Sequence, residues 1–354
     1  MYPFSLRNRY PARHLAEQRA GYPAGLSLLE LLVTVVISTV ILSVSLGVIV
    51  SQRRQHLNQQ ANTDTGQTLR AAMDMIGNDI RQAGEQIGAG TRLPVLSLLD
   101  GAASAPDRLV LQRKLIALEL NVCSDMAAGS PTAILVADKN NPNCIYSDGD
   151  TNGVPDDVQE WTTFRCQQDD VDGCQTTTPP NCQQAGGSDR ECAWAYLYDP
   201  VNGRGEFFVY AGERPNPSNA DQYQVNIQTI PAQTTFANAY PAANRPKLYL
   251  LEQRQYSLSA PDAKGDRTLQ LQLTDARNRV TYAVVNRLRD FQAKVLSPSG
   301  WVDQFNAGSP PFENWQATQA VEVRLQSANT GPDAPSPLQT FTSQFYPRNS
   351  NSRP

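Results

Sequence analysis

An uninterrupted apolar run near the N-terminus constrains this chain more than any other feature. From Leu26 to Val50 the sequence reads LSLLELLVTVVISTVILSVSLGVIV, 25 residues in which Glu30 is the single charge. As a helix rising about 1.5 Å per residue, this run is longer than the roughly 30 Å hydrocarbon core of a bilayer. The sequence therefore predicts a membrane-spanning helix over residues 26–50.

The flanks of the run predict its orientation. Residues 1–25 form a polar leader with four arginines and one glutamate, and the run is followed by Ser51-Gln52-Arg53-Arg54. A cleavable secretory signal would have a shorter apolar stretch, about 7 to 15 residues, and a small-residue cleavage site after it. Basic residues before the run favour a cytoplasmic N-terminus, although Arg53 and Arg54 weaken this bias. We therefore expect the rest of the chain outside the cytoplasm.

All six cysteines fall within residues 123–192. An even count confined to one region predicts two or three disulfides in an oxidising compartment, with the pairing open. Reduced thiols are the alternative. Zinc is disfavoured, because the region has no CxxC pair and both histidines, His14 and His56, lie outside it. The disulfide candidates are Cys123, Cys144, Cys166, Cys174, Cys182 and Cys192.

Residues 51–88 continue the helical pattern in more polar sequence. Three glycines, Gly66, Gly77 and Gly84, would each weaken an isolated helix by about 1 kcal/mol relative to alanine, so packing must hold this half in place. Apolar residues recur at spacings of three and four, which predicts one stripe facing a folded head. The stripe comprises Leu69, Met73, Ile76, Ile80, Ala83 and Ile87.

Residues 89–354 change to short β-rich runs separated by Pro, Gly, Asn and Asp clusters. The fold class predicted is α+β: a long N-terminal helix packed on an antiparallel sheet. A cysteine-rich insertion, 121–192, and a stretch over 213–246 are expected to be rich in loops, and neither is expected to build a core alone. The predicted strands are 108–120, 132–137, 194–198, 206–210, 247–258, 268–273, 280–285, 291–296, 320–326 and 340–345.

The overall charge argues against nucleic acid as a partner. The formal net charge is -4, the pI is about 5.3, and lysine and arginine are scattered along the chain. Nucleic-acid-binding domains usually carry a clustered basic patch instead.

The residues at the start of the apolar run resemble a known processing motif. The sequence Ala24-Gly25-Leu26-Ser27-Leu28-Leu29-Glu30 follows a basic leader and resembles the prepilin cleavage and methylation motif, commonly G-F-[ST]-L-[IVL]-E. The resemblance implies a cut between Gly25 and Leu26 by a cytoplasm-facing prepilin peptidase, which also methylates the new N-terminus. One departure is Leu26, where most members of the family have Phe.

Glu30 would become the fifth residue of the mature chain. A carboxylate in an apolar helix costs roughly 2.5 to 3.5 kcal/mol at the centre of a membrane, and less near its edge. A new α-amino group on a neighbouring subunit could supply the cationic partner during assembly and set staggered helices in register. The alternative is a side chain that reaches the membrane surface and has no role in assembly.

Further segments are similar to the PilW family of minor pilins. Residues 74–84, DMIGNDIRQAG, resemble that family's D-[IL]-R-x-A-G helix end. Residues 284–293, Trp315 with 319–325, and Arg348-Asn349 are similar to its late strands and ending. The match covers the first 85 residues well and the last 75 loosely, and leaves the middle of the chain uncovered.

The resemblance implies a pilin-like fold and a minor pilin that helps to prime or cap a type IV pilus. Its location would be the inner membrane, single-pass with a periplasmic head, and then the pilus fibre. Its partners would be other minor pilins, the major pilin, prepilin peptidase and the inner-membrane assembly platform. Three alternatives stay open: minor pseudopilin J of type II secretion, a pilus-tip adhesin, and a single-pass exported enzyme.

One loop of the insertion partly matches a calcium-binding motif. Residues 148–157, DGDTNGVPDD, have the D-x-[DN]-x-[DN]-G start of such a loop, but the twelfth position is Gln159, where a bidentate Glu is expected. The alternative is a turn rich in Asp, Asn and Gly that binds no metal. The predicted ligands of Ca²⁺ are Asp148, Asp150, Asn152, the carbonyl of Val154, and Asp156.

We expect no enzyme activity. Once the leader is removed, His56 is the only histidine, and the head offers no Ser-His-Asp or Cys-His set. The four tryptophans, Trp161, Trp194, Trp301 and Trp315, are expected to pack in the core, because tryptophan is highly buried on average.

Overall fold

The computed structural model describes residues 27–88, 93–101, 105–129, 131–142, 144, 146–167, 193–227, 235–275, 279–306, 313–328 and 338–350. The chain divides into two compact units, Met1–Leu57 and Asn58–Pro354. Helix α1 (Leu28–Gln82) contributes its first half to the first unit and its second half to the second. The long N-terminal helix that the sequence predicts is therefore confirmed.

The C-terminal end of α1 is set by a glycine. Gly84 adopts a φ of +77°, a conformation that favours glycine. Its N–H leaves the helical pattern and donates to the carbonyl of Gln112 at 2.9 Å. The helix therefore stops at Gln82, and the chain turns toward the first strands.

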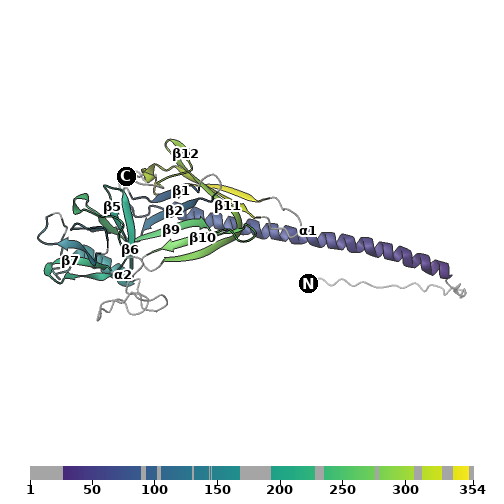
Figure 1. Ribbon diagram of the computed structural model, residues 1–354, viewed down its shortest axis with the longest axis horizontal. Coiled ribbons are helices and arrows are strands. Elements are labelled where there is room, and N and C mark those ends of the chain that lie inside the picture. Colours follow the sequence, from purple (N-terminus) through teal and green to yellow (C-terminus); the bar gives the residue numbers. More distant parts are fainter. Residues whose placement is uncertain are drawn as a thin grey trace, which may run out of the picture. The chain divides into compact units, whose positions relative to one another are not determined.

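The second half of α1 packs against the main sheet (Figure 1). The six residues predicted for its apolar stripe, from Leu69 to Ile87, are all buried, as predicted. The helix is shorter than the predicted half over 51–88, so the last two of them, Ala83 and Ile87, follow its end. All six share one core with apolar residues of the sheet, among them Leu111, Phe291 and Val323.

Within the described residues, the main sheet has eight strands and every pairing between them is antiparallel. Its longest strand, β11, pairs with β10 through its first half and with β13 through its second. The order is β1 (Leu96–Leu99), β2 (Arg108–Lys114), β9 (Leu251–Leu258), β10 (Arg267–Thr274), β11 (Arg279–Ser297), β13 (Ala320–Ser327) and β14 (Thr340–Phe345), with β12 (Gly300–Val302) paired to β11.

A second antiparallel sheet has its own core with helix α2 (Asp156–Gln167). Strand β8 is separated from β9 by Leu250 alone, so one run of chain passes from this sheet to the main sheet. Outside the two sheets, short 3₁₀ helices cover Ala242–Asn244 and Trp315–Ala317. The strand order is β3 (Leu120–Asn121), β8 (Lys247–Tyr249), β5 (Ala193–Asp199), β6 (Arg204–Asn216), β7 (Asn219–Ile227) and β4 (Ala133–Asp138).

The structure corrects three predictions about the head. Each predicted strand coincides with observed strand, but two sheets are present where one was expected. The insertion contains α2, and the stretch predicted as loop over 213–246 contains β7. In β7, alternate residues such as Val225 are buried in the second core. In α2, residues spaced by three to four, such as Trp161, are buried there. Strands β1 and β12 were not predicted at all.

Candidate functional site

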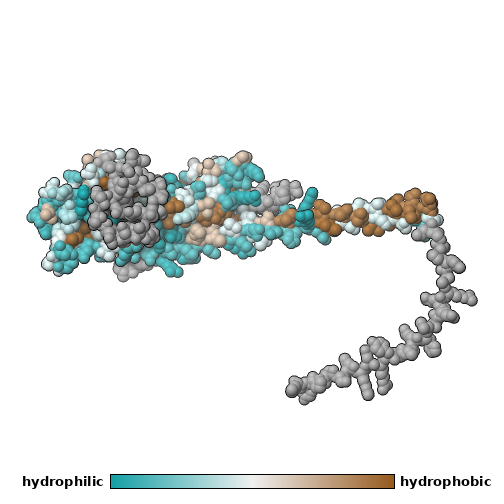
Figure 2. All heavy atoms as spheres, turned by 90° about the horizontal axis from the view of Figure 1, so that it is seen from below, coloured by the Kyte–Doolittle hydropathy of each residue, from teal (hydrophilic) through white to brown (hydrophobic). Residues whose placement is uncertain are grey.

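The first half of α1 presents apolar side chains on all sides. Among the described residues, α1 is the one helix long and apolar enough to cross a membrane. Its large apolar residues from Leu28 to Val50 are about half exposed or more, and Figure 2 shows this part of the chain in brown. A surface of this kind needs lipid or other apolar helices around it.

Four hydroxyl side chains in this half satisfy themselves within the helix. Thr34, Thr39 and Ser43 each donate to the carbonyl three residues earlier, and Ser45 to the carbonyl four residues earlier, all at 2.8 Å. Their polar groups therefore need no partner from outside. Glu30 is the exception, because it is the one ionisable group between Leu28 and Val50.

Ser27 caps the start of α1 and places Glu30 in its first turn. The N–H of Glu30 donates to the Oγ of Ser27 at 3.2 Å and to its carbonyl at 2.9 Å. Ser-x-x-Glu is the capping-box spacing, a signal that the sequence analysis missed. Glu30 thus lies in the first turn of α1, at the positive end of the helix dipole. Gly25 and Leu26, the predicted cleavage site, lie outside the described residues.

The other end of α1 is fixed by a buried acid. The carboxylate of Asp79, 4% exposed, accepts hydrogen bonds from the hydroxyl of Tyr256 and the guanidinium of Arg254. Arg254 also pairs with Glu252 at 2.7 Å, and Glu252 in turn pairs with Arg113 at 3.0 Å. Burial raises the pKa of Asp79 against the opposing effects of Tyr256 and Arg254. This network ties the last turn of α1 to β2 and β9.

Residues that are far apart in the sequence meet at the C-terminal end of α1. The Arg81 guanidinium lies 5.7 Å from the centre of the Phe345 ring. The amide of Asn349 donates to the carbonyl of Ala83 at 3.0 Å, and the N–H of Arg348 donates to the carbonyl of Arg81. The D-I-R-Q-A-G segment at the end of α1 therefore forms the surface against which the residues near the C-terminus pack.

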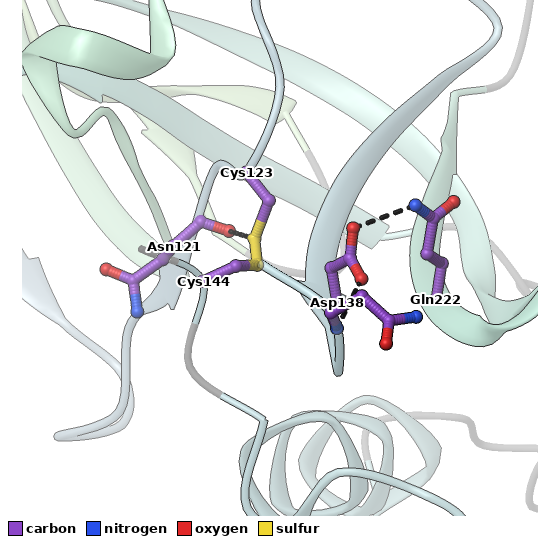
Figure 3. Close-up of a disulfide and its surroundings, with 6 residues drawn as sticks. Asn121, Cys123, Asp138, Cys144 and Gln222 are labelled. Carbon is purple, nitrogen blue, oxygen red and sulfur yellow. Dashed lines mark hydrogen bonds between the residues drawn. A yellow bond between two sulfur atoms is a disulfide. The ribbon is translucent and has the colours of Figure 1, made fainter. Parts of the chain in front are cut away.

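A disulfide joins Cys123 and Cys144, with the two Cα atoms 5.4 Å apart (Figure 3). It links the segment after β3 to the segment that leads into residues 148–157, which we call the acidic loop. Next to it, the amide of Gln222 donates to the carboxylate of Asp138 at 2.8 Å, which links β7 to β4. Cys166, near the end of α2, is also disulfide-bonded. Cys174, Cys182 and Cys192 lie outside the described residues.

The acidic loop brings together three of the five predicted calcium ligands. One carboxylate oxygen from each of Asp148, Asp150 and Asp156 lies within 4.8 Å of the other two. The side chain of Asn152, the fourth predicted ligand, makes hydrogen bonds within the loop. Its Oδ1 accepts from the N–H of Val154 at 2.7 Å, and its amide nitrogen donates to Asp150 at 2.8 Å. Three carboxylates this close repel one another, and a cation with oxygen ligands would relieve that repulsion.

Backbone geometry holds this loop in place. Thr151 and Gly153 have φ values of 57° and 86°, so the chain turns sharply between the first and last carboxylates. The N–H of Gly153 donates to Asp148 at 2.9 Å, and the N–H of Gly149 donates to Asp156 at 3.1 Å. These hydrogen bonds are equally expected of a turn that binds no metal, so both interpretations of the motif stand.

Helix α2 is fixed to the second sheet by buried polar contacts. The Trp161 Nε1 donates to the hydroxyl of Tyr210 at 2.8 Å. Arg165 pairs with Glu213 at 3.0 Å, with side chains 8% and 1% exposed. Removing one partner of a buried ion pair strongly destabilises the folded state, because the other charge stays buried without compensation. Helix α2 is therefore a firm support for the acidic loop before it.

The tryptophans divide between core and surface. Trp161 and Trp315 are buried, as predicted. Trp194 is half-buried with the Arg279 guanidinium 4.5 Å from its ring centre. Trp301 is 42% exposed, so the prediction of a core position was wrong for this residue. It follows the tight β11–β12 turn at Gly300, a position that the sequence analysis did not identify as a strand.

Comparison with known proteins leaves the family open. No protein-family model matches the chain, and no curated protein matches it. What the chain does must therefore be inferred from its motif residues and from the contacts described above.

Proposed function

We propose that this chain is a pilin-like subunit, specifically a minor pilin that primes or caps type IV pilus assembly. The observation that carries the proposal is the start of α1. A capped apolar helix begins two residues after a predicted processing site, and its lone acid, Glu30, stands in the first turn. The helix cap can account for an acid at this position in any anchor, but a subunit that must pair with a neighbour's α-amino group also needs the charge itself.

The division of α1 between two environments supports the same proposal. Its first half has exposed apolar side chains on all sides, and its second half buries one stripe against the main sheet. Such a helix can leave the membrane and enter a bundle of similar helices without a change in the head. Lipid and neighbouring apolar helices are equivalent surroundings for its first half.

The contacts at the end of α1 are consistent with the PilW resemblance. Two segments that carry it, D-I-R-Q-A-G and Arg348-Asn349, lie far apart in sequence and meet here. On this proposal the protein waits in the inner membrane with its head in the periplasm. It then joins other minor pilins and the major pilin, after cleavage by prepilin peptidase and with the help of the assembly platform.

The decisive experiment is intact mass and N-terminal sequencing of the membrane-extracted protein. Cells with and without prepilin peptidase should be compared. A chain that begins at Leu26 only when the peptidase is present is the expected result. A chain that still begins upstream of Gly25 in both strains would show that Glu30 belongs to an ordinary anchor and would overturn the proposal.

Minor pseudopilin J of type II secretion is the nearest alternative, because it shares the processing motif and the plan of the head. The two functions differ in which machine requires the protein. Deleting the gene should abolish pili and leave secretion intact if the protein is a minor pilin. Loss of secretion with normal pili would favour the pseudopilin.

A further inference from the structure

A cleft of about 760 Å³ opens on the polar face of the main sheet. Its floor is made by β11 and β13, where Gln292 and Lys294 lie beside Glu322, Arg324 and Gln326. Residues that alternate with them, such as Phe291 and Val323, point to the core and are fully buried. The cleft is therefore on the side of these strands that faces away from α1.

Strand pairing fixes the positions of the polar groups in the cleft. Gln292 is directly opposite Arg324, and Lys294 is directly opposite Glu322. Adjacent strands lie about 4.8 Å apart, and alternate residues along a strand lie about 7 Å apart. Donors and acceptors therefore form a regular grid on a rigid surface, which is a good basis for recognising an extended polar ligand.

Several of these groups keep hydrogen-bonding capacity for a ligand. Lys294 pairs with Asp303 at 3.2 Å, and Glu322 accepts from the amide of Gln344 at 3.1 Å, which leaves each carboxylate further lone pairs. Arg324 is exposed, and the part of the chain that the structure describes offers it no hydrogen-bond or ion-pair partner. Its five N–H donors are free in the middle of the cleft.

An exposed aromatic ring lies on the same face of the sheet, outside the residues that line the cleft. Trp301 of β12 is directly opposite Leu296 of β11, two residues along the strand from Lys294. Opposite residues in an antiparallel pair project to the same side of the sheet. Trp301 is 42% exposed, so it presents a flat apolar surface beside the grid of polar groups.

We propose that this cleft binds an oligosaccharide. Each sugar hydroxyl both donates and accepts, so it can satisfy carboxylates, amides and the Arg324 guanidinium in turn. The C–H face of a pyranose ring matches the flat surface of Trp301. The lining has four carboxylates and three cationic side chains, which disfavours a polyanion such as nucleic acid, and its polarity disfavours an apolar ligand.

The test measures binding of defined oligosaccharides to the full chain in detergent. The probes are cellohexaose, chitohexaose and hexagalacturonate, titrated to about 10 mM with calorimetry and tryptophan fluorescence. We expect saturable binding of at least one of the two neutral probes, because the proposal rests on recognition of hydroxyl groups. Binding of hexagalacturonate alone would contradict the proposal, because the lining carries more carboxylates than cations.

Two substitutions then locate the site. Trp301→Ala and Arg324→Ala should each weaken binding by about tenfold, with Trp301→Phe and Arg324→Lys intermediate. The matched controls are Tyr346→Ala and Arg108→Ala, which remove an exposed aromatic ring and an exposed arginine outside the cleft. Both controls should bind as the unchanged chain does. All four positions are exposed, so thermal melting should confirm that each variant folds.

The proposal is overturned by either of two results. One is the absence of saturable binding for both neutral probes. The other is binding that neither cleft substitution weakens. The proposal does not depend on whether the chain is a minor pilin.

Discussion

At the scale of single residues, two glycines, one in α1 and one in the turn that ends it, make room for aromatic rings of the head. A Cβ added at Gly77 would overlap the ring of Phe345, and one added at Gly84 would overlap Trp315. Gly66 differs, since its nearest neighbour would be the Gln339 Oε1 at 3.6 Å, an ordinary van der Waals distance. The same residue type therefore serves close packing at two positions and is dispensable at the third.

This difference predicts opposite effects of one substitution. Both changes to alanine gain about 0.5 to 1 kcal/mol of helix propensity. We expect Gly66→Ala to keep that gain. Gly77→Ala should lower the free energy of unfolding by about 1 to 2 kcal/mol net, because overpacking costs about 1 to 3 kcal/mol. Urea unfolding of the full chain, followed by tryptophan fluorescence, measures both.

Phe345→Leu in the Gly77→Ala background provides the control, because a smaller side chain should restore part of the lost stability. Equal shifts for Gly66→Ala and Gly77→Ala would contradict the packing argument.

Asp199 links the turn after β5 to the chain before β8. Its buried carboxylate accepts from the N–H groups of Val201 and Asn202 at 2.9 and 3.0 Å, and from the side-chain amides of Asn202 and Asn244. Burial acts to raise the pKa of Asp199, but these hydrogen bonds outweigh burial, so the pKa lies below its usual 3.8. The folded state therefore favours the ionised form.

The lowered pKa predicts how Asp199 contributes to stability at different pH. As the pH falls, the unfolded chain takes up this proton before the folded chain does, so protonation favours unfolding. The contribution should be fully present above pH ~5 and should be lost as the pH falls through the folded pKa. The unfolding free energy of Asp199→Asn should thus fall below that of the unchanged chain at neutral pH, by about 1 to 3 kcal/mol, and approach it in acid. A difference that is the same at every pH would exclude this account.

Sequence reasoning reached some of these residues and not others. Glu30 was found because one charge in an apolar run is visible without any structure. The roles of Gly77 and Asp199 could not be found, because their partners Phe345 and Asn244 are distant in sequence and only the folded chain selects them. The capping of Glu30 by Ser27 was a local signal, and the Ser-x-x-Glu spacing would have revealed it.

At the scale of elements, sequence periodicity predicted the helices and strands that have a strong hydrophobic pattern. The core stripe of α1 and the strands of the main sheet have such patterns. Helix α2 was missed because its sequence, DDVQEWTTFRCQ, is mostly polar and follows a loop-like composition. Strand β7 was missed for the same reason, although Tyr223, Val225 and Ile227 alternate as a half-buried strand requires.

The acidic loop before α2 yields a prediction about metal. If the calcium interpretation of the motif is correct, millimolar Ca²⁺ should raise the melting temperature of the chain by a few degrees, because an ion that binds only the folded state stabilises it. EDTA should reverse the shift, and Asp150→Asn should abolish it. Asp262→Asn, in a turn of the main sheet, is the matched control and should keep the response. Equal melting temperatures with Ca²⁺ and with EDTA would identify the loop as a turn that binds no metal.

At the scale of the whole molecule, the head needs both of its cores. Tyr196 and Tyr198 of β5 and Tyr249 of β8 belong to the second sheet, yet they are buried in the core of the main sheet. A sequence pattern shows that a residue is buried but not in which core, so two sheets could not be distinguished from one. The insertion is thus part of the folded head and not an appendage, and deleting residues 121–192 would remove β4, α2 and half of the two-residue strand β3.

The proposed function makes its sharpest prediction at Glu30. Glu30→Gln keeps the size and polarity of the side chain but removes the charge that a neighbour's α-amino group would need. We expect the variant to be processed at Gly25 and to reach the membrane at the normal level, yet to be depleted by about tenfold from sheared filaments. The matched control is Asp64→Asn, which removes an exposed acid from the same helix without contact to the apolar run.

If the Glu30→Gln chain entered filaments as well as the control does, the carboxylate would have no role in assembly. Its position would then be explained by the local contacts already seen, the cap at Ser27 and the positive end of the helix dipole. If Glu30→Gln is depleted from filaments and Asp64→Asn is not, the carboxylate has a role in assembly that is separate from the helix cap. The cap uses the backbone N–H of Glu30, which the substitution leaves in place.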